Sequence, residues 1–252
     1  MEENIIASKK FQGQTNLSII REYSGEPEFT FHASLYDNLL GIIDVATTAT
    51  PLLNKPLDIV FNRVLKRGFD IVISIIMIVG ILSWLIPIIG ILIWVDSKGP
   101  LFFLQKRNKR NADVFTCIKF RSMILNENSD TLPALPNDKR ITRIGHFLRD
   151  NYIDELPQFF NVLWGDMSVI GPRPHMVSDN IKFEQEIEYY SYRHRIKPGI
   201  TGLAQVLGYV GAIEDIQKMK ERVSMDIFYQ RRWSIKLDII IMWRTMLKQF
   251  HF

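Results

Sequence analysis

Residues 71–95 read IVISIIMIVGILSWLIPIIGILIWV, a run of 25 residues without one charged side chain. An α-helix needs about 20 apolar residues to cross the hydrocarbon core of a bilayer, so this run is long enough to enter lipid. About 70 residues precede it and no small-residue cleavage site follows, which excludes a signal peptide. A buried core helix is the alternative, but a core helix of this length normally keeps a polar face. The sequence therefore predicts a membrane-embedded helix.

Basic residues flank the apolar run on both sides. They are Arg63, Lys66 and Arg67 before it, and Lys98, Lys106, Arg107, Lys109 and Arg110 after it. The positive-inside rule places both flanks in the cytoplasm, which a single span cannot do. We therefore expect a re-entrant helix that Pro87 breaks, with Ser83 bonding a backbone carbonyl that the break opens. A Pro-kinked ordinary span is the alternative that these features leave open.

The rest of the composition is that of a folded domain. Of the 252 residues 47% are hydrophobic and 23% are charged, which excludes disorder of the whole chain. The single cysteine excludes a disulfide framework and a cysteine zinc cluster. Residues 1–60 carry a net charge of −4, whereas residues 61–252 carry +8. A basic segment that begins with an apolar run favours a membrane surface or a phosphate-bearing substrate over nucleic acid.

Local patterns divide the chain into three parts and favour an α+β fold. Residues 1–60 are acidic and turn-rich and are interpreted as a partly ordered appendage. Residues 61–95 hold the re-entrant helix, and residues 96–252 form a small mixed domain on the cytoplasmic side. Within that domain the alternation in residues 114–123 predicts a strand, and residues 126–139 are polar and predict a loop.

Helices are expected in the second half of this domain. A short one follows Asp154 and ends at Gly165, a residue type typical of helix C-termini. Two more are expected over residues 182–197 and 216–230. Residues 231–250 combine apolar side chains, tryptophans and scattered bases, the pattern of a helix lying in the membrane interface. An ordinary core-packing helix is the alternative for that segment.

Asp154 and Glu155 stand at the start of the short helix. One interpretation is a capping pair, because Asp is a favoured N-cap and acids suit the first turn. The functional interpretation rests on cations suited to phosphates, namely Arg140, Arg143 and Arg149 upstream and Arg173 in a Gly-Pro-Arg-Pro turn downstream. A carboxylate among cations stays ionised and can act as a nucleophile. A second carboxylate beside it can hold Mg²⁺, which bridges to phosphate oxygens.

Other catalytic patterns are missing from the sequence. It contains no P-loop and no GxGxxG, and its five histidines show no metal-ligand spacing. His175 and His194 are interpreted as surface or structural residues, and Cys117 as a buried thiol.

The motifs of residues 61–252 resemble those of the bacterial sugar transferases, the monotopic phosphoglycosyl transferases that start exopolysaccharide, capsule or O-antigen repeat units. They are KRGFDIVIS (66–74), DSKGPLFFLQKR (96–107), KFRSM (119–123), RITRIGHFLR (140–149), DELPQFFNVLWGDMSVIGPRP (154–174) and KPGITGLAQVLG (197–208). The long block that begins with DELPQ is the most specific of them. The GPRPH, RHRIKPGITG and YQRRWSIKLDI stretches look most like the branch that transfers glucose 1-phosphate.

The resemblance implies transfer of a sugar 1-phosphate from a UDP-sugar to undecaprenyl phosphate, with release of UMP. It implies that Asp154 is the nucleophile, forming a phosphosugar–aspartyl intermediate, and that Glu155 helps to bind Mg²⁺. Arg149 and the Pro-Arg-Pro turn would face the diphosphate and the uridine. The substrate-binding residues are expected to be Lys119, Arg121, Arg140, Arg143, Pro172, Arg173 and Pro174. The residues expected at the headgroup level are Lys66, Arg67 and Asp70, with Ser83 and Pro87 at the break.

The resemblance also implies a location and partners. We expect the cytoplasmic face of the bacterial inner membrane, contact with membrane lipid, no nucleic acid, and a homodimer as an open alternative to a monomer. A membrane-anchored scaffold of a polysaccharide assembly complex is the alternative function. A scaffold would have no need of Asp154, Glu155 and Arg149, which are all present.

The chain departs from the family pattern at a few positions. Ser83 and Pro87 are separated where the family usually has Ser-Pro, which leaves the break point open. Lys109 and Ala112 replace glycines, and Tyr152 stands where a smaller polar residue is common. None of these departures touches the Asp-Glu pair.

Overall fold

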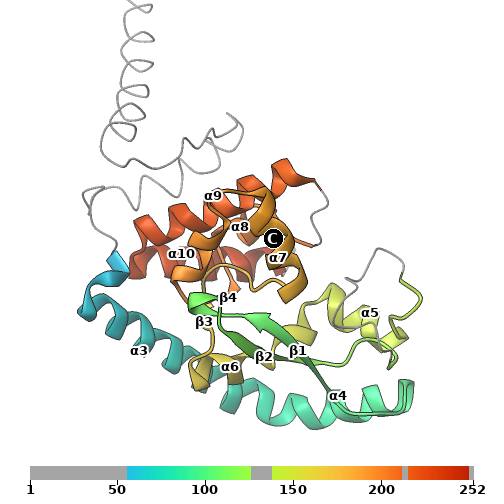
Figure 1. Ribbon diagram of the computed structural model, residues 1–252. Coiled ribbons are helices and arrows are strands. Elements are labelled where there is room, and N and C mark those ends of the chain that lie inside the picture. The colour runs from blue at the N-terminus through green and yellow to red at the C-terminus, as the bar shows by residue number, and fades with distance from the viewer. Residues whose placement is uncertain (1–55, 126–137, 212–214, 250–252) are drawn as a thin grey trace, which may run out of the picture.

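A computed structural model describes residues 56–125, 138–211 and 215–249 (Figure 1). Most of the expected appendage and most of the expected loop over 126–139 lie outside the described residues. The described chain mixes helices with two small sheets, as the α+β expectation requires. Its elements are η1 (Pro56–Asp58), α3 (Val60–Met77), η2 (Ile78–Leu82), α4 (Ser83–Asp96), β1 (Phe102–Asn108), η3 (Arg110–Ala112), β2 (Val114–Phe120), α5 (Arg143–Asp150), η4 (Ile153–Glu155), α6 (Gln158–Trp164), β3 (Ser168–Ile170), α7 (Val177–Glu186), η5 (Tyr190–Arg195), β4 (Gly199–Thr201), α8 (Leu203–Val206), α9 (Ile216–Arg232) and α10 (Ile235–Gln249).

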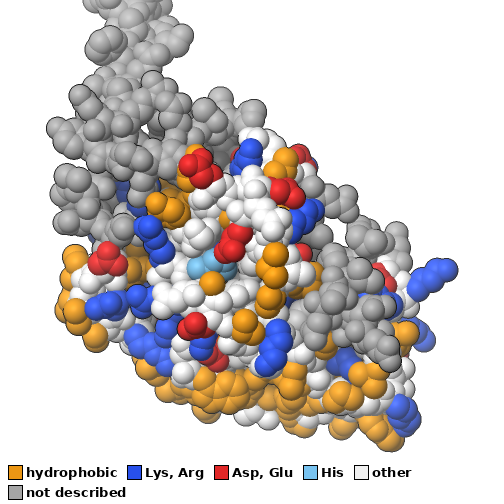
Figure 2. All heavy atoms as spheres, viewed as in Figure 1, with side chains coloured by type: hydrophobic (Ala, Val, Ile, Leu, Met, Phe, Trp, Pro, Cys, Tyr) orange, Lys and Arg blue, Asp and Glu red, His pale blue; other side chains and the backbone are white. Residues whose placement is uncertain are grey.

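The apolar run forms one helical segment from Val60 to Asp96, made of α3, η2 and α4. Within the described residues it is the one helix long and apolar enough to cross a membrane, and little of it is buried inside the protein. Hydrophobic side chains gather along the edge of the molecule that α3 and α4 form (Figure 2). The segment is therefore compatible with a membrane anchor.

The helix is irregular at η2, a π-helical turn just before Pro87. In this wider turn the Ser83 N–H bonds the Ile78 carbonyl, so the Val79 carbonyl loses its usual partner. The Ser83 hydroxyl donates to Val79 O at 2.6 Å, and the Trp84 indole donates to Gly80 O at 2.8 Å. Ser83 thus satisfies an opened carbonyl, but it is the π-turn that opens it. Pro87 lies inside α4, which continues on both sides of it, so the expected break at Pro87 is wrong in its place. Figure 1 shows the chain changing direction between α3 and α4, as π-turns and prolines cause.

Three polar side chains near the start of the helix bind the folded domain. The Lys66 ammonium donates to Asp238 Oδ2 at 2.8 Å and to the Tyr229 hydroxyl at 3.0 Å. Asp70 Oδ1 accepts hydrogen bonds from the Ser168 hydroxyl and from the Val169 N–H, each at 2.9 Å. The third, Arg67, donates to the carbonyls of Val162 and Leu163 at the end of α6. Their expected place at the lipid headgroups stays a prediction, but each of them fixes α3 to the domain.

The other end of the helix is bound to the same domain. Asp96 Oδ2 accepts a hydrogen bond from the Ile144 N–H at 2.8 Å, at the start of α5. The buried Arg121 donates to the carbonyls of Ser97 and Lys98 at 2.7 and 3.0 Å. One folded body therefore holds both flanks of the apolar segment.

Two small sheets position the rest of the domain. Strands β1 and β2 form an antiparallel hairpin in which Phe102 pairs with Phe120, so the strand expected over 114–123 is confirmed but ends at residue 120. Strands β3 and β4 pair in parallel. Where they meet, a Cβ on Gly199 would lie 2.1 Å from the nitrogen of Gly171, so neither the GPRP nor the KPGITG motif can carry a larger residue there.

The helix expected over 182–197 is wrong in its bounds. α7 ends at Glu186, and the chain continues through an extended Ile187 into the 3₁₀-helix η5. Ile187 and Tyr190 pack into a small core with side chains of α9, and this burial outweighs the helical pattern of the sequence.

The helices expected over residues 216–230 and 231–250 are both present, with the boundary between them shifted by a few residues. α9 runs to Arg232, and α10 begins at Ile235 after Ser234 accepts a hydrogen bond from the Leu237 N–H at 3.1 Å. α10 buries Leu237 completely but leaves Trp243 59% exposed. It therefore has a core face together with an exposed apolar face, and its place in the membrane interface stays a prediction.

Candidate active site

A short 3₁₀-turn presents Asp154 and Glu155. α5 begins after Thr142, whose hydroxyl accepts a hydrogen bond from the Gly145 N–H, and the chain then reverses at Tyr152. Tyr152 has φ 55°, a left-handed conformation that costs a bulky residue about 1–2 kcal/mol. The N-cap of α6 is Pro157, so Asp154 does not cap that helix and the capping interpretation is wrong.

Glu155 is 8% exposed and is held by two cations. The Lys119 ammonium donates to Oε1 at 2.7 Å. The Arg173 guanidinium donates to both carboxylate oxygens, to Oε2 at 2.9 Å, in the bidentate geometry that arginine favours. Burial alone would raise the pKa of Glu155, but the charges of Arg173 and Lys119 outweigh burial and place the pKa well below its ordinary value. Glu155 is therefore ionised and fixed in place.

Asp154 lies beside this ion pair but in a different electrostatic state. It is 7% exposed, and its carboxylate makes no hydrogen bond to any residue that the structure describes. Burial raises the pKa of Asp154 to about 6, although the positive charges of Lys119, Arg149 and Arg173 lower it. A desolvated carboxylate without hydrogen-bond donors is available for nucleophilic attack.

The structure gathers part of the predicted site. Lys119 comes from β2, Arg149 from α5 and Arg173 from the turn after β3, and all three act electrostatically on Asp154. Pro172 and Pro174 flank Arg173 and restrict the turn that carries it.

Three other predicted residues have partners elsewhere. Arg121 binds the carbonyls after α4, as described above. Arg140 forms a bidentate pair with Asp138, and the charge of Arg143 acts on Asp96. Their predicted contact with substrate stays a prediction.

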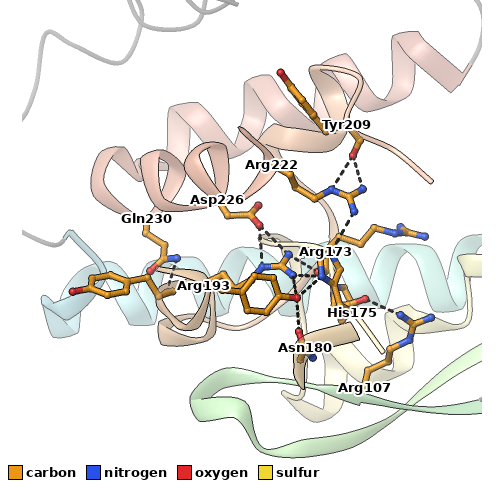
Figure 3. Close-up of polar contacts among 12 residues, drawn as sticks. Arg107, Arg173, His175, Asn180, Arg193, Tyr209, Arg222, Asp226 and Gln230 are labelled. Carbon is orange, nitrogen blue, oxygen red and sulfur yellow. Dashed lines mark hydrogen bonds and ion pairs between the residues drawn. The ribbon is translucent and has the colours of Figure 1, made fainter. Parts of the chain in front are cut away.

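Sequence reasoning missed a buried polar network behind the turn (Figure 3). It consists of Arg107, His175, Asn180, Tyr190, Arg193, Arg222 and Asp226. Burial, followed by the charges of Arg193 and Arg222, places the pKa of His175 well below its ordinary value. The histidine is thus neutral and structural, as expected. The sequence signal for this network is weak: it is the Arg-His-Arg run of residues 193–195, of which only Arg193 belongs to the network.

The site offers few ligands to a metal ion. Within the described residues, no three His, Cys, Asp or Glu side chains gather where they could hold one. Glu155 accepts three hydrogen bonds of the roughly four that a carboxylate can accept, so Oε2 keeps one free lone-pair direction. Mg²⁺ commonly binds one or two carboxylates together with substrate phosphates. The residues present fit an ion of that kind.

Comparisons with known proteins give the family. The model of the bacterial sugar transferase family matches residues 61–251. A Klebsiella pneumoniae protein named UDP-glucose:undecaprenyl-phosphate glucose-1-phosphate transferase is 44% identical over 201 residues, which are 79% of this chain and 43% of that protein. An Aeromonas hydrophila protein named UDP-N-acetylgalactosamine-undecaprenyl-phosphate N-acetylgalactosaminephosphotransferase is 43% identical over 185 residues, 72% of this chain and 43% of that protein.

A shorter relative matches over almost its whole length. It is the exopolysaccharide production protein PSS of Rhizobium leguminosarum bv. phaseoli, 39% identical over 193 residues, 75% of this chain and 96% of that protein. The chain spans less than half the length of the Klebsiella and Aeromonas relatives. A family match that covers three quarters of the chain, over the residues that build the Asp154 site, shows that the chain belongs to the bacterial sugar transferases.

Proposed function

We propose that this chain transfers a sugar 1-phosphate from a UDP-sugar to undecaprenyl phosphate and releases UMP. The observation that carries the proposal is the buried Asp154, which has no hydrogen-bond donor among the described residues and is surrounded by the charges of Lys119, Arg149 and Arg173. The named relatives that act on UDP-sugars and undecaprenyl phosphate support it. A scaffold would not require such a desolvated carboxylate.

The chemistry divides into two displacements on one phosphorus atom. The Asp154 carboxylate attacks the sugar-proximal phosphorus, the bond from that phosphorus to the bridging oxygen breaks, and UMP leaves with the electron pair. A phosphate oxygen of undecaprenyl phosphate then attacks the same phosphorus and releases Asp154. The cations around the site stabilise the charge that develops on the transferred group and on the departing UMP. Glu155 holds Arg173 and Lys119 in place for both steps.

Glu155 would also hold Mg²⁺ through its free Oε2 direction, together with phosphate oxygens of the substrate. When bound, the ion would neutralise negative charge on the diphosphate of the substrate.

Glucose 1-phosphate is the proposed transferred group. The motifs of this chain and the names of several relatives favour glucose. The Aeromonas protein, of nearly equal identity, is instead named for an N-acetylated sugar. The test is UMP release by membrane fractions given undecaprenyl phosphate and each of a panel of UDP-sugars. Fastest release from UDP-glucose is expected. Faster release from UDP-galactose or an N-acetylated donor would overturn the choice of glucose, and no release from any donor would overturn the proposed reaction.

The pH dependence of the first displacement follows from the pKa of Asp154. Because attack needs the ionised carboxylate and the pKa is about 6, kcat/KM for the UDP-sugar should fall about tenfold per pH unit below 6 and level off above 7. In a two-step mechanism this quantity depends on the first displacement alone, so titration of the lipid phosphate does not disturb it. A flat profile between pH 5 and 7.5 would contradict the assignment.

The long helix is proposed to re-enter the membrane on its own side, at the cytoplasmic face of the bacterial inner membrane. Lys66, Arg67 and Asp70 bind the folded domain at one end of the helix, and Asp96 binds it at the other. An ordinary span would place these two sets of contacts on opposite sides of the bilayer. UDP-sugars are cytosolic, so the domain must face the cytoplasm to use them.

Single-cysteine labelling tests this topology. In a Cys117→Ala background, Val60→Cys and Lys98→Cys should both resist an impermeant thiol reagent on intact spheroplasts and react after lysis. Cys117 is buried and its removal leaves no other cysteine. Labelling of the Val60→Cys protein alone would show an ordinary span. Labelling of both in intact spheroplasts would place the domain outside.

A further inference from the structure

The Pro172-Arg173-Pro174 turn is held through its carbonyl oxygens. Prolines have no N–H, so a turn with two of them has few backbone donors of its own. Three consecutive carbonyls instead accept hydrogen bonds from elsewhere in the chain. Pro172 O accepts from the Gly199 N–H at 2.9 Å, Arg173 O from Arg193 Nη2 at 2.8 Å, and Pro174 O from Arg107 Nη1 at 3.2 Å.

Arg193 is the central member of these three donors (Figure 3). Arg193 is only 3% exposed. Besides the Arg173 carbonyl, its guanidinium donates to Asp226 Oδ2 through Nε at 3.2 Å and through Nη2 at 2.9 Å. Its Nη1 contacts the Tyr190 hydroxyl at 3.2 Å and His175 Nδ1. The guanidinium thus joins α9 and η5 to the turn and has almost no freedom to move.

Arg173 links this anchored turn to the active site, because its side chain binds Glu155. Its guanidinium donates to both Glu155 oxygens, while its carbonyl receives Arg193. A shift of this turn moves the Arg173 guanidinium relative to Asp154 and Glu155. Misplacement of a catalytic group by about 1 Å can cost about 100-fold in rate.

We infer that Arg193 is a positioning residue, which fixes the Arg173 carbonyl so that the Arg173 guanidinium is aligned for the diphosphate of the substrate. Arg193 itself does not touch Asp154 or Glu155 in the described structure; it acts through the turn. This inference rests on the proposed function for the substrate, but the anchoring of the turn does not.

The test is a double-mutant cycle on UDP-glucose-dependent UMP release. Arg193→Lys keeps the charge but loses the planar fork that reaches Asp226 and the carbonyl together, so kcat/KM should fall about 100-fold. If Arg193 acts through Arg173, adding Arg193→Lys to an Arg173→Lys protein should lower kcat/KM by less than about threefold relative to Arg173→Lys alone. A full multiplication of the two losses would overturn the inference.

Arg222→Lys is the matched control. Arg222 is as buried as Arg193 and also contacts His175, but it donates to the Tyr209 carbonyl and not to the turn. Its effect on kcat/KM should therefore multiply with that of Arg173→Lys. An Arg222→Lys variant with the same non-additivity as Arg193→Lys would show a general response of the buried network and would overturn the specific role.

Hydrogen exchange gives a readout that does not depend on activity. The amides of Gly171, Arg173, His175 and Met176 should exchange faster in Arg193→Lys than in the wild type and in Arg222→Lys, and unchanged exchange would overturn the anchoring. If Arg193→Lys does not fold, Asp226→Asn, which removes the carboxylate that holds Arg193, carries both measurements. If the wild type releases no UMP, the proposed function fails, while the exchange experiment still decides whether Arg193 holds the turn.

Discussion

Replacing Asp154 with Asn should abolish UMP release, lowering turnover by about 10³-fold or more. An amide cannot form the acyl phosphate that the first displacement requires. The Asn side chain has nearly the same shape, and the Asp154 carboxylate makes no hydrogen bond to a described residue that the change would break. Because burial raises the pKa of Asp154, its ionised form is unfavourable for folding at pH 7. The Asp154→Asn protein should therefore be at least as stable as the wild type.

The matched control is Asp150→Asn, on the exposed end of α5 four residues earlier. It removes the same charge from the residue that follows Arg149 in the sequence and should keep most of the activity. The measurement is UMP release, in membrane fractions normalised to protein, together with a thermal unfolding curve for each variant. Near-wild-type turnover by Asp154→Asn would reject Asp154 as the nucleophile. A loss of activity with a large loss of stability would point to a structural role instead.

Local chemistry allowed several elements to be predicted from the sequence. Strand β2 follows from the alternation in residues 114–120, although its pairing with β1 was not predicted. The end of α6 follows from Gly165, which has φ 97°, a conformation that favours glycine. In these cases the residue type and its immediate neighbours determine the backbone.

The roles of the arginines could not be predicted in the same way. Arg121 and Arg173 both lie in motifs shared with the family, yet Arg121 binds backbone carbonyls at the end of the long helix while Arg173 binds Glu155. A guanidinium suits a carbonyl, a carboxylate and a phosphate alike, so only tertiary contacts decide between them. The anchoring of the turn by Arg193 is hidden from the sequence for the same reason, because its partners come from η5, α9 and the turn itself.

The long helix shows a further limit. Its hydropathy predicts that it enters lipid, and its flanks predict on which side its ends lie. The π-helical turn, however, accompanies a burial pattern in which Leu82 is completely buried while Val79 and Trp84 stay exposed. No local pattern in residues 78–82 indicates that packing.

Replacing Glu155 with Gln should have the second large effect. The amide is not an equivalent substitute for the carboxylate, because it offers one acceptor oxygen where Glu155 receives three hydrogen bonds from Lys119 and Arg173. Removing one partner of a buried ion pair costs about 3–5 kcal/mol, a large share of the roughly 5–15 kcal/mol that typically stabilises a domain. The free energy of unfolding should fall by about this amount, measured by denaturant titration in detergent.

The same substitution tests the proposed place of Mg²⁺. Excess EDTA should stop UMP release by the wild type, and Mg²⁺ should restore it. In Glu155→Gln the Mg²⁺ concentration for half-maximal activity should rise at least about tenfold, since even partners outside the ligand shell change metal affinity by about 10–100-fold.

Lys119→Met is the control with the opposite expectation. It removes a cation from Glu155 Oε1 and frees an oxygen for the ion, so its Mg²⁺ midpoint should stay or fall although its turnover drops. Full activity of the wild type in EDTA, or an unchanged midpoint in Glu155→Gln, would remove Glu155 from the metal site and leave it the role of holding Arg173 and Lys119.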